Sequence, residues 1–315
     1  MAKDSEPNRL ELAKLAFEQY DSGVLSISLL ASGLESEVYK IDTLQSSYAL
    51  KLPLYAIANN ANDLHVNYYD VLKQEWLILE SIAKASSHSP NLKPNLIPAP
   101  DPLFFGVLND SPFLIQTYIE NDNSKVSQTD KLKVLARIHK LPLKSKFLPV
   151  AHEQEKMTST VIALRILRRL ETLRKLHDIG GVFKWLDSEL LVSVMCSDSN
   201  KNCLLHMDFR NANILTLDNK VSAVIDWSNA LVGSRLIELA RLDIYGEFSL
   251  KKLKEFALAS QIVFHSLPYS IYKLDTIVML CLVFLSEAPC QTKARSLLNK
   301  LFSVERAILL ELDNE

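Results

Sequence analysis

The chain has 315 residues, of which 48% are hydrophobic and 23% are charged, with a net charge of -2 at pH 7 and a pI near 6.4. This composition is that of an ordinary globular protein with one large core or two linked cores. The absence of a basic excess and of blocks of like charge argues against a nucleic acid as partner.

The sequence contains no clear signal for export or membrane insertion. Residues 1–9 are polar and lack the apolar core of a secretory signal, so we expect a cytoplasmic protein. The longest apolar run, residues 277–285, is about half of what a bilayer requires, which predicts a buried core helix and no membrane partner. The cysteines form no C-x-x-C pair and have no His partner at zinc spacing, which predicts reduced thiols rather than disulfides or a metal site. They are Cys196, Cys203, Cys281 and Cys290.

The first part of the chain alternates between helical and strand patterns. Apolar positions at helical spacing predict a leading helix over residues 8–20 and a longer one over 69–84. The polar, proline-rich residues 86–102 predict a connection. Five segments have strand patterns, and the last two meet near Asn109 and Asp110. These segments are 24–30, 37–44, 48–52, 104–108 and 113–119.

Helical patterns dominate the second part of the chain. They predict helices over residues 130–139, 156–177, a long stretch after 251, and 294–312. Because the β-rich part precedes the α-rich part, we expect an α+β protein with two lobes. The lobes comprise residues 1–119 and 120–315, with a hinge between Gln116 and Asn121.

Two short segments in the second lobe carry the residue types that phosphoryl transfer requires. Residues 206–215 read HMDFRNANIL, and residues 224–227 read VIDW. Transfer from ATP needs a carboxylate facing the acceptor hydroxyl and two oxygen ligands that hold Mg²⁺ against the phosphates. Asp208, Asn213 and Asp226 match these roles. The alternative is that these Asp and Asn residues only cap turns, as they often do.

The pattern H-x-D-x-x-x-x-N followed by I-D-W resembles the aminoglycoside phosphotransferase family and its small-molecule kinase relatives. The similarity covers about residues 32–241 and implies a bilobal protein-kinase-like fold. Met207 stands where many members have Gly, and Ser234-Arg235 replaces the usual Asp-Pro. The family resemblance further implies ATP, or alternatively GTP, and Mg²⁺ as cofactors.

The resemblance implies a set of nucleotide-binding residues in the first lobe. Lys51 has the position of the lysine that contacts the α and β phosphates. Glu75 would pair with it, because Glu80, five residues later, faces another side of the helix. The adenine contacts assume that Gln116 is the gatekeeper. The remaining positions are Gly33 and Ser36 in the phosphate loop, Val38, Ala49, Leu215 and Ile225 as adenine walls, and the Thr117 carbonyl and Ile119 N–H as adenine contacts.

The same resemblance assigns roles in the catalytic loop. Asp208 would orient the acceptor hydroxyl and accept its proton, while Asn213 and Asp226 hold the metal. His206 would brace the loop. Arg210 would neutralise charge on the γ-phosphate, and the alternative is a surface arginine or a salt-bridge partner.

The acceptor is less well defined by the sequence. A polycationic aminoglycoside requires an acidic pocket, to which Asp187, Glu189, Asp243 and Glu247 could contribute. The basic residues of the helix predicted over 156–177 are interpreted as a solvated face, which argues against a strongly cationic acceptor. They are Arg165, Arg168, Arg169, Arg174 and Lys175. We expect a hydroxylated small molecule as partner: an aminoglycoside-like antibiotic, an amino alcohol, a sugar or a biosynthetic intermediate.

Two other functional classes stay open. A pseudokinase would keep the fold and bind a nucleotide or a partner without turnover. A protein kinase would need an activation loop, and no A-P-E segment follows Asp226 before Glu238. For the assembly we expect a monomer or a homodimer.

Overall fold

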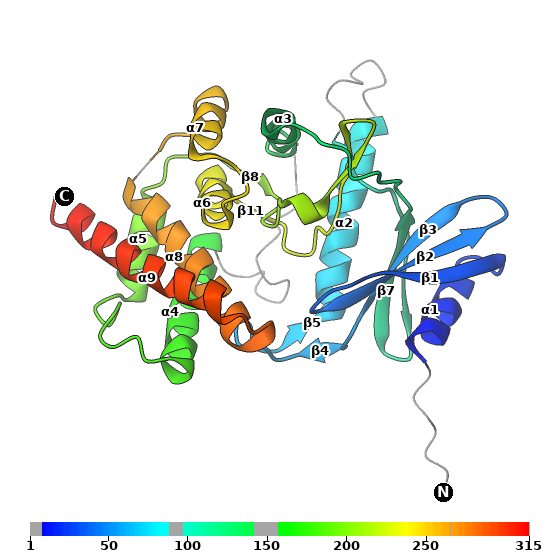
Figure 1. The fold of residues 1–315 in the computed structure, drawn as a ribbon, viewed down its shortest axis with the longest axis horizontal. Helices are drawn as coiled ribbons and strands as arrows, with labels where there is room; N and C mark the ends of the chain where they lie inside the picture. The colour runs from blue at the N-terminus through cyan, green and yellow to red at the C-terminus, as the bar shows by residue number, and fades with distance from the viewer. Residues whose placement is uncertain (1–7, 88–96, 142–156, 265, 315) are drawn as a thin grey trace, which may run out of the picture.

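The computed structural model describes residues 8–87, 97–141, 157–264 and 266–314. A sheet-containing part and a larger helical part lie side by side along the longest axis (Figure 1). The predicted α+β architecture is thus confirmed. The expected polar segment at residues 1–9 and the connection at 86–102 lie mostly outside the described residues.

The first part contains an antiparallel five-stranded sheet of order β1-β2-β3-β7-β6. Each predicted strand and both predicted helices are present within a few residues. A short hairpin, β4 with β5, was not predicted. The elements are α1 (Arg9–Glu18), β1 (Val24–Ser32), β2 (Ser36–Thr43), β3 (Ser47–Pro53), β4 (Ile57–Ala58), β5 (Val66–Asn67), α2 (Tyr68–Ser87), β6 (Pro102–Leu108) and β7 (Ser111–Thr117).

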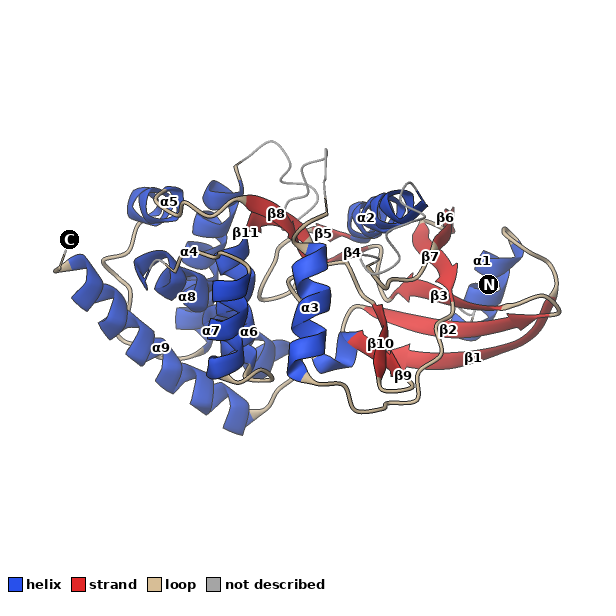
Figure 2. Cartoon of the chain, turned by 90° about the horizontal axis from the view of Figure 1, so that it is seen from above, coloured by secondary structure: helices blue, strands red, loops and turns tan. Residues whose placement is uncertain are grey.

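The sheet lies between α1 and α2 (Figures 1 and 2). Side chains alternate along each strand, so Leu50 and Leu52 join the small core under α1, while Ala49 and Lys51 point to the other face. Asn109 and Asp110 both have positive φ and connect β6 to β7. This geometry matches the twist of the two strands, which explains why the predicted turn forms there.

The second part is mainly helical and contains two small two-stranded sheets, β8 with β11 and β9 with β10. The four predicted helical segments are present, and the stretch after residue 251 is divided in two. The elements are α3 (Gln128–Ile138), α4 (Thr158–Leu176), α5 (Ser188–Cys196), β8 (Asn202–Leu205), the 3-10 turn η3 (Asn211–Asn213), β9 (Ile214–Leu217), β10 (Lys220–Val224), β11 (Leu231–Ser234), α6 (Arg235–Tyr245), α7 (Leu250–Ala259), α8 (Ser266–Leu282), the π-helical turn η4 (Val283–Glu287) and α9 (Gln291–Leu312).

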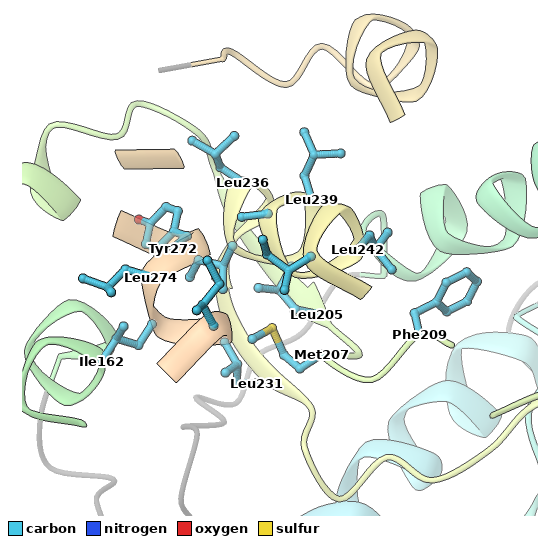
Figure 3. Packing of buried hydrophobic residues seen from close by; sticks show 14 of the residues in the cluster. Ile162, Leu205, Met207, Phe209, Leu231, Leu236, Leu239, Leu242, Tyr272 and Leu274 are labelled. Atoms are coloured by element: carbon cyan, nitrogen blue, oxygen red, sulfur yellow. The ribbon is translucent and has the colours of Figure 1, made fainter. Parts of the chain in front are cut away.

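The larger core supports the segment between β8 and β9. Leu205 on β8 and Leu236 on α6 are fully buried, and Met207 and Phe209 extend the same core (Figure 3). Leu114 on β7 and four residues of α2 join this core as well. Because one apolar cluster underlies both α2 and the 206–215 segment, it fixes their relative positions.

The apolar run at residues 277–285 lies in α8 and η4. The helical segment Ser266–Glu287 is long and apolar enough to cross a membrane by length and composition alone, but 61% of its apolar window is buried inside the protein. This burial is typical of a core helix. The four cysteines are free thiols, and Cys281 is buried in this core.

Candidate active site

A cavity of about 690 Å³ lies between the sheet and the helical part. Every nucleotide-binding position predicted from the sequence lines it, from Gly33 and Ser36 through Val38, Ala49, Lys51 and Glu75 to Thr117, Ile119, Leu215 and Ile225. Asp208, Arg210, Asn213 and Asp226 line it as well. We call the part bounded by these sheet and loop residues the nucleotide half. The part bounded by the β4–β5 turn, α4, α6, α8, η4 and the start of α9 is the acceptor half.

Lys51 forms two ion pairs, one with Glu75 in its own lobe and one with Asp226 in the other lobe. Its Nζ lies 2.8 Å from Glu75 Oε2 and 2.7 Å from Asp226 Oδ1. The side chain of Glu75 is 1% exposed, whereas Glu80 pairs with Lys84 on the surface. The choice of Glu75 over Glu80 is therefore confirmed.

At Asp226 and Trp227 the backbone is strained and is held in place by hydrogen bonds. Asp226 has φ 63, a left-handed conformation that is costly for a residue other than glycine. Glu75 Oε1 accepts the N–H of Trp227 at 3.1 Å, and the buried indole donates to the Val224 carbonyl at 3.0 Å. These bonds hold the Asp226 carboxylate toward the cavity, where it is 39% exposed.

The Asp226 carboxylate is stabilised in its charged form. Enclosure in the cavity would raise its pKa, but the ammonium of Lys51 and the hydroxyl of Ser228 outweigh this effect and hold the pKa far below its usual range. An ionised carboxylate is the strongest ligand that this segment can offer to a divalent cation. Ser228 was not predicted as part of the site, because a serine two residues after an Asp carries no distinctive sequence signal.

Asp208 lies at the centre of the segment between β8 and η3. Asn213 donates through Nδ2 to Asp208 Oδ2 at 2.7 Å and to its carbonyl at 2.9 Å. Tyr245 donates to Asp208 Oδ1 at 3.1 Å. Because the Asn213 amide nitrogen is engaged, its carbonyl oxygen is the atom that could ligate a metal. The Ile225 N–H donates to the backbone carbonyl of Asn213 at 2.9 Å. Because Asp226 follows Ile225, this bond brings the two predicted metal-ligating residues next to each other.

His206 is fully buried and connects the two segments. Its Nδ1 accepts the N–H of Asp208 at 3.2 Å, and its Nε2 lies 3.1 Å from the Ile225 carbonyl. These partners require the tautomer with its proton on Nε2. The ring also packs edge-on against Trp227 with 4.6 Å between centroids. His206 does not line the cavity, so its position agrees with the predicted bracing role.

Met207 occupies the position where a glycine was expected, and its φ is 65. The backbone is held on both sides: Glu238 Oε1 accepts the Met207 N–H at 2.7 Å, and Arg241 Nη1 donates to its carbonyl at 2.9 Å. The other oxygen of Glu238 lies 2.7 Å from His139 Nε2. Buried bonds of this kind can keep a non-glycine residue in a strained conformation. Glu238 and Arg241 were not predicted as site residues, because their contacts with the Met207 backbone depend on how α6 packs against the 206–215 segment.

Arg210 forms a bidentate pair with Asp208, with distances of 2.6 and 2.7 Å. Its guanidinium also lies over the Tyr245 ring at 5.4 Å, and the hydrogen bonds with Asp208 raise its pKa. The salt-bridge alternative considered for Arg210 is thus realised in this state. This pair uses the Nε–H and one Nη2–H of the five guanidinium N–H donors.

Gly33 lies in the turn between β1 and β2, as expected for the phosphate loop. Its own N–H donates to the Ser36 carbonyl at 2.9 Å and closes this turn. The Gly33 N–H is therefore not available to a phosphate in this conformation.

At the adenine end, no described residue accepts the Ile119 N–H, and the neighbouring Tyr118 N–H donates to the Ser47 carbonyl.

Three arginines of the basic face predicted for α4 pair with a carboxylate of the protein, so the interpretation of this face as solvated was wrong for them. The carboxylate of Asp63, in the β4–β5 turn, accepts hydrogen bonds from Arg165, Arg168 and Arg169 at 2.7–3.1 Å. Arg169 is 1% exposed and also pairs with Asp275 at 2.9 Å. The sequence pattern of α4 could not show this, because Asp63 lies about 100 positions away and belongs to an unpredicted hairpin. Arg174 donates to the Val182 carbonyl, and Lys175 pairs with Glu171 at the surface.

The four acidic residues considered for a cationic acceptor do not line the cavity. Asp187 caps α5, and Glu189 is exposed on the same helix. Asp243 pairs with Lys273, and Glu247 accepts the N–H of Asn211. These residues therefore do not form the acidic pocket that a polycationic acceptor would require.

Comparison with known proteins gives a consistent result. A sequence profile described as the phosphotransferase enzyme family matches residues 26–249. No curated protein sequence matches the chain. Among solved structures, a thermostable mutant of aminoglycoside phosphotransferase APH(4)-Ia, in ternary complex with AMP-PNP and hygromycin B, is 17% identical with a TM-score of 0.65, covering 94% of this chain and 98% of that chain.

Two further solved structures are similar. A putative fructosamine-3-kinase from Haemophilus somnus 129PT is 16% identical with a TM-score of 0.59, covering 92% of this chain and 96% of that chain. The GDP complex of an aminoglycoside 2'-phosphotransferase-IIIa mutant is 15% identical with a TM-score of 0.58, covering 95% and 98%. At these identities the likeness establishes a shared protein-kinase-like fold.

Proposed function

Since the chain belongs to the phosphotransferase enzyme family and is a small-molecule kinase, we propose that it moves the γ-phosphate of ATP directly to a hydroxyl of a small polar molecule. The observation that carries this proposal is the convergence of Lys51, Asp226, Asn213 and Asp208 on one cavity. These groups come from both lobes, and turn capping explains neither their convergence nor the strained backbone at Asp226.

Each residue has a distinct part in the proposed reaction. Glu75 holds Lys51 in place, and Lys51 then contacts the phosphates. The Asp226 carboxylate and the side-chain Oδ1 of Asn213 offer the hard oxygen ligands that Mg²⁺ prefers. When bound there, Mg²⁺ would neutralise negative charge on the phosphate oxygens. Asp226 now pairs with the Lys51 ammonium, and bound Mg²⁺ would take the place of this ammonium at the Asp226 carboxylate.

Asp208 acts on the acceptor. Its carboxylate orients the hydroxyl and accepts the proton as the acceptor oxygen bonds to the γ-phosphorus and the bond to the β–γ bridging oxygen breaks. The products are ADP and a phosphate monoester. Because Arg210 occupies both Asp208 oxygens, the hydroxyl and the guanidinium compete for the carboxylate. We propose that Arg210 turns toward the transferring phosphate when both substrates are bound.

The experiment that tests this function is product analysis. The purified protein is incubated with Mg²⁺, ATP and a panel of sugars, polyols, amino alcohols and aminoglycosides, and mass spectrometry follows ADP and phosphorylated acceptors. We expect ADP and one phosphate monoester in equal amounts, both requiring Mg²⁺. Tight binding of Mg²⁺ and ATP without any phosphorylated acceptor would favour the pseudokinase alternative.

A further inference from the structure

The acceptor half of the cavity contains carboxylates, but arginines already neutralise two of them. Asp63 accepts hydrogen bonds from Arg165, Arg168 and Arg169. Asp275 lies 2.9 Å from Arg169 Nη1 and 3.7 Å from Arg241 Nη2. In this cluster four guanidinium groups face two carboxylates. The local charge is therefore positive.

Because this cluster is buried, its positive charge acts strongly on a ligand in the cavity. Burial lowers the pKa of Arg169, and the nearby Arg165 and Arg241 lower it further, because like charges repel in a medium of low dielectric constant. Arg169 and Asp275 are both more than nine-tenths buried. A positive field in such a cavity is screened less by salt than one on the surface.

The mouth of the acceptor half adds another cation. Lys293, in the first turn of α9, lines the cavity and lies over the Phe284 ring at 4.8 Å. Among the described residues no carboxylate lies within ion-pair distance of its ammonium. Two further carboxylates line the cavity near this side. Glu287 accepts hydrogen bonds from the Asn62 backbone and side chain at 3.3 and 3.0 Å, and Glu35, close to Glu287, hydrogen-bonds with Tyr68. With Lys293 and the four arginines counted against Asp63, Asp275, Glu287 and Glu35, the cations still outnumber the carboxylates by one.

These charges decide between classes of acceptor. A polycationic acceptor needs several carboxylates that are free to receive ammonium groups, and burying an unmatched cation beside guanidinium groups is unfavourable. An anionic acceptor meets the opposite field. Resting on the proposed function, we infer that the physiological acceptor carries a carboxylate or phosphate in addition to the hydroxyl that is phosphorylated, and that Lys293 and the Arg165–Arg169 cluster attract this anionic group.

The inference is tested with acceptors that share one six-carbon polyol chain and differ in charge. Gluconate and sorbitol 6-phosphate are the anionic arms, sorbitol is neutral, and glucamine is cationic. Thermal shift in the presence of Mg²⁺ and AMP-PNP measures binding, and phosphorylation with ATP is measured separately. We expect at least one anion to bind about tenfold more tightly than sorbitol, with glucamine weakest. The more effective anion distinguishes a carboxylate from a phosphate.

A charge-reversal pair makes the test specific. Lys293→Glu should remove the preference for the anion over sorbitol. Lys300→Glu, with the same charge change at an exposed position of α9 outside the cavity, is the control. Tighter binding of glucamine, equal binding of all arms, no binding by any arm, or the same result for both variants would overturn the inference. If an anion binds selectively but no arm is phosphorylated, the inference on charge stands and transfer to these polyols has failed.

Discussion

The two halves of the cavity obtain their functional groups in different ways. In the nucleotide half, Lys51 and Glu75 lie 24 positions apart, and Asp208, Asn213 and Asp226 lie in the two neighbouring segments 206–215 and 224–227. In the acceptor half, the charged groups come from the β4–β5 turn, α4, α6, α8 and the start of α9. The chemistry of a nucleotide and Mg²⁺ constrains spacing along the chain, whereas acceptor recognition depends on which distant side chains the fold brings together.

The largest expected effect belongs to Asp208, where the two halves meet. We expect Asp208→Asn to lower the rate of transfer roughly 10²–10⁴-fold, because the amide cannot accept the proton of the hydroxyl. Affinity for Mg²⁺ and ATP should stay nearly unchanged, since the interaction is needed mainly in the transition state. Steady-state kinetics and calorimetry measure the two quantities. A wild-type rate in this variant would separate Asp208 from the chemistry.

The next effect concerns the metal ligands of the nucleotide half. Asp226→Ala should weaken binding of Mg²⁺ and ATP about 100-fold or more, because it removes a negative charge. Asn213→Ala should weaken it less, because an amide ligates the metal without neutralising its charge. Calorimetric titration with and without Mg²⁺ compares the variants. Unchanged affinity in Asp226→Ala would remove this metal assignment.

Lys51 and Glu75 test whether the nucleotide half is held by one buried pair. Lys51→Met should lower turnover about 10²-fold by removing a charge from the phosphates. It should also destabilise the protein by roughly 3–5 kcal/mol, because Glu75 would remain buried without its partner. Glu75→Gln should affect both quantities less, since an amide oxygen can still accept the Trp227 N–H. Chemical denaturation and kinetics on both variants give the comparison, and equal losses in the two would contradict it.

The smallest effect is expected at Asp63 in the acceptor half. Burial would raise the pKa of Asp63, but Arg165 and Arg169 outweigh this effect and hold the pKa at about 2. Because this value lies below the unfolded pKa, the paired carboxylate stabilises the fold near neutral pH and loses this effect as pH falls from about 4 toward 2. Asp63→Asn should therefore cost about 2 kcal/mol at pH 7. The cost, measured by denaturation, should shrink below pH 4, and a cost independent of pH would argue against the ion cluster.

The same difference between the halves explains what could be predicted from the sequence. The family resemblance assigned Ala49, Lys51 and Glu75 to the site. Their positions reach the cavity through local geometry, because alternate residues of β3 share one face of the sheet and Glu80 faces another side of α2 than Glu75. Asp63 and Glu238 were missed as site residues, since their roles depend on contacts with α4 and with the Met207 backbone. The closure of the β1–β2 turn by the Gly33 N–H could not be predicted either, since a single glycine indicates a turn but not the hydrogen bonds within it.

The central claim is that the γ-phosphate passes directly from ATP to an acceptor hydroxyl. Rapid-quench analysis of a single turnover, with protein in excess over ATP labelled at the γ-phosphate and with the best acceptor found by product analysis, tests it most directly. We expect the label to leave ATP and enter the acceptor with one rate constant, without labelled protein at any time. Label that accumulates on the protein, or that stays on bound ATP, would contradict direct transfer.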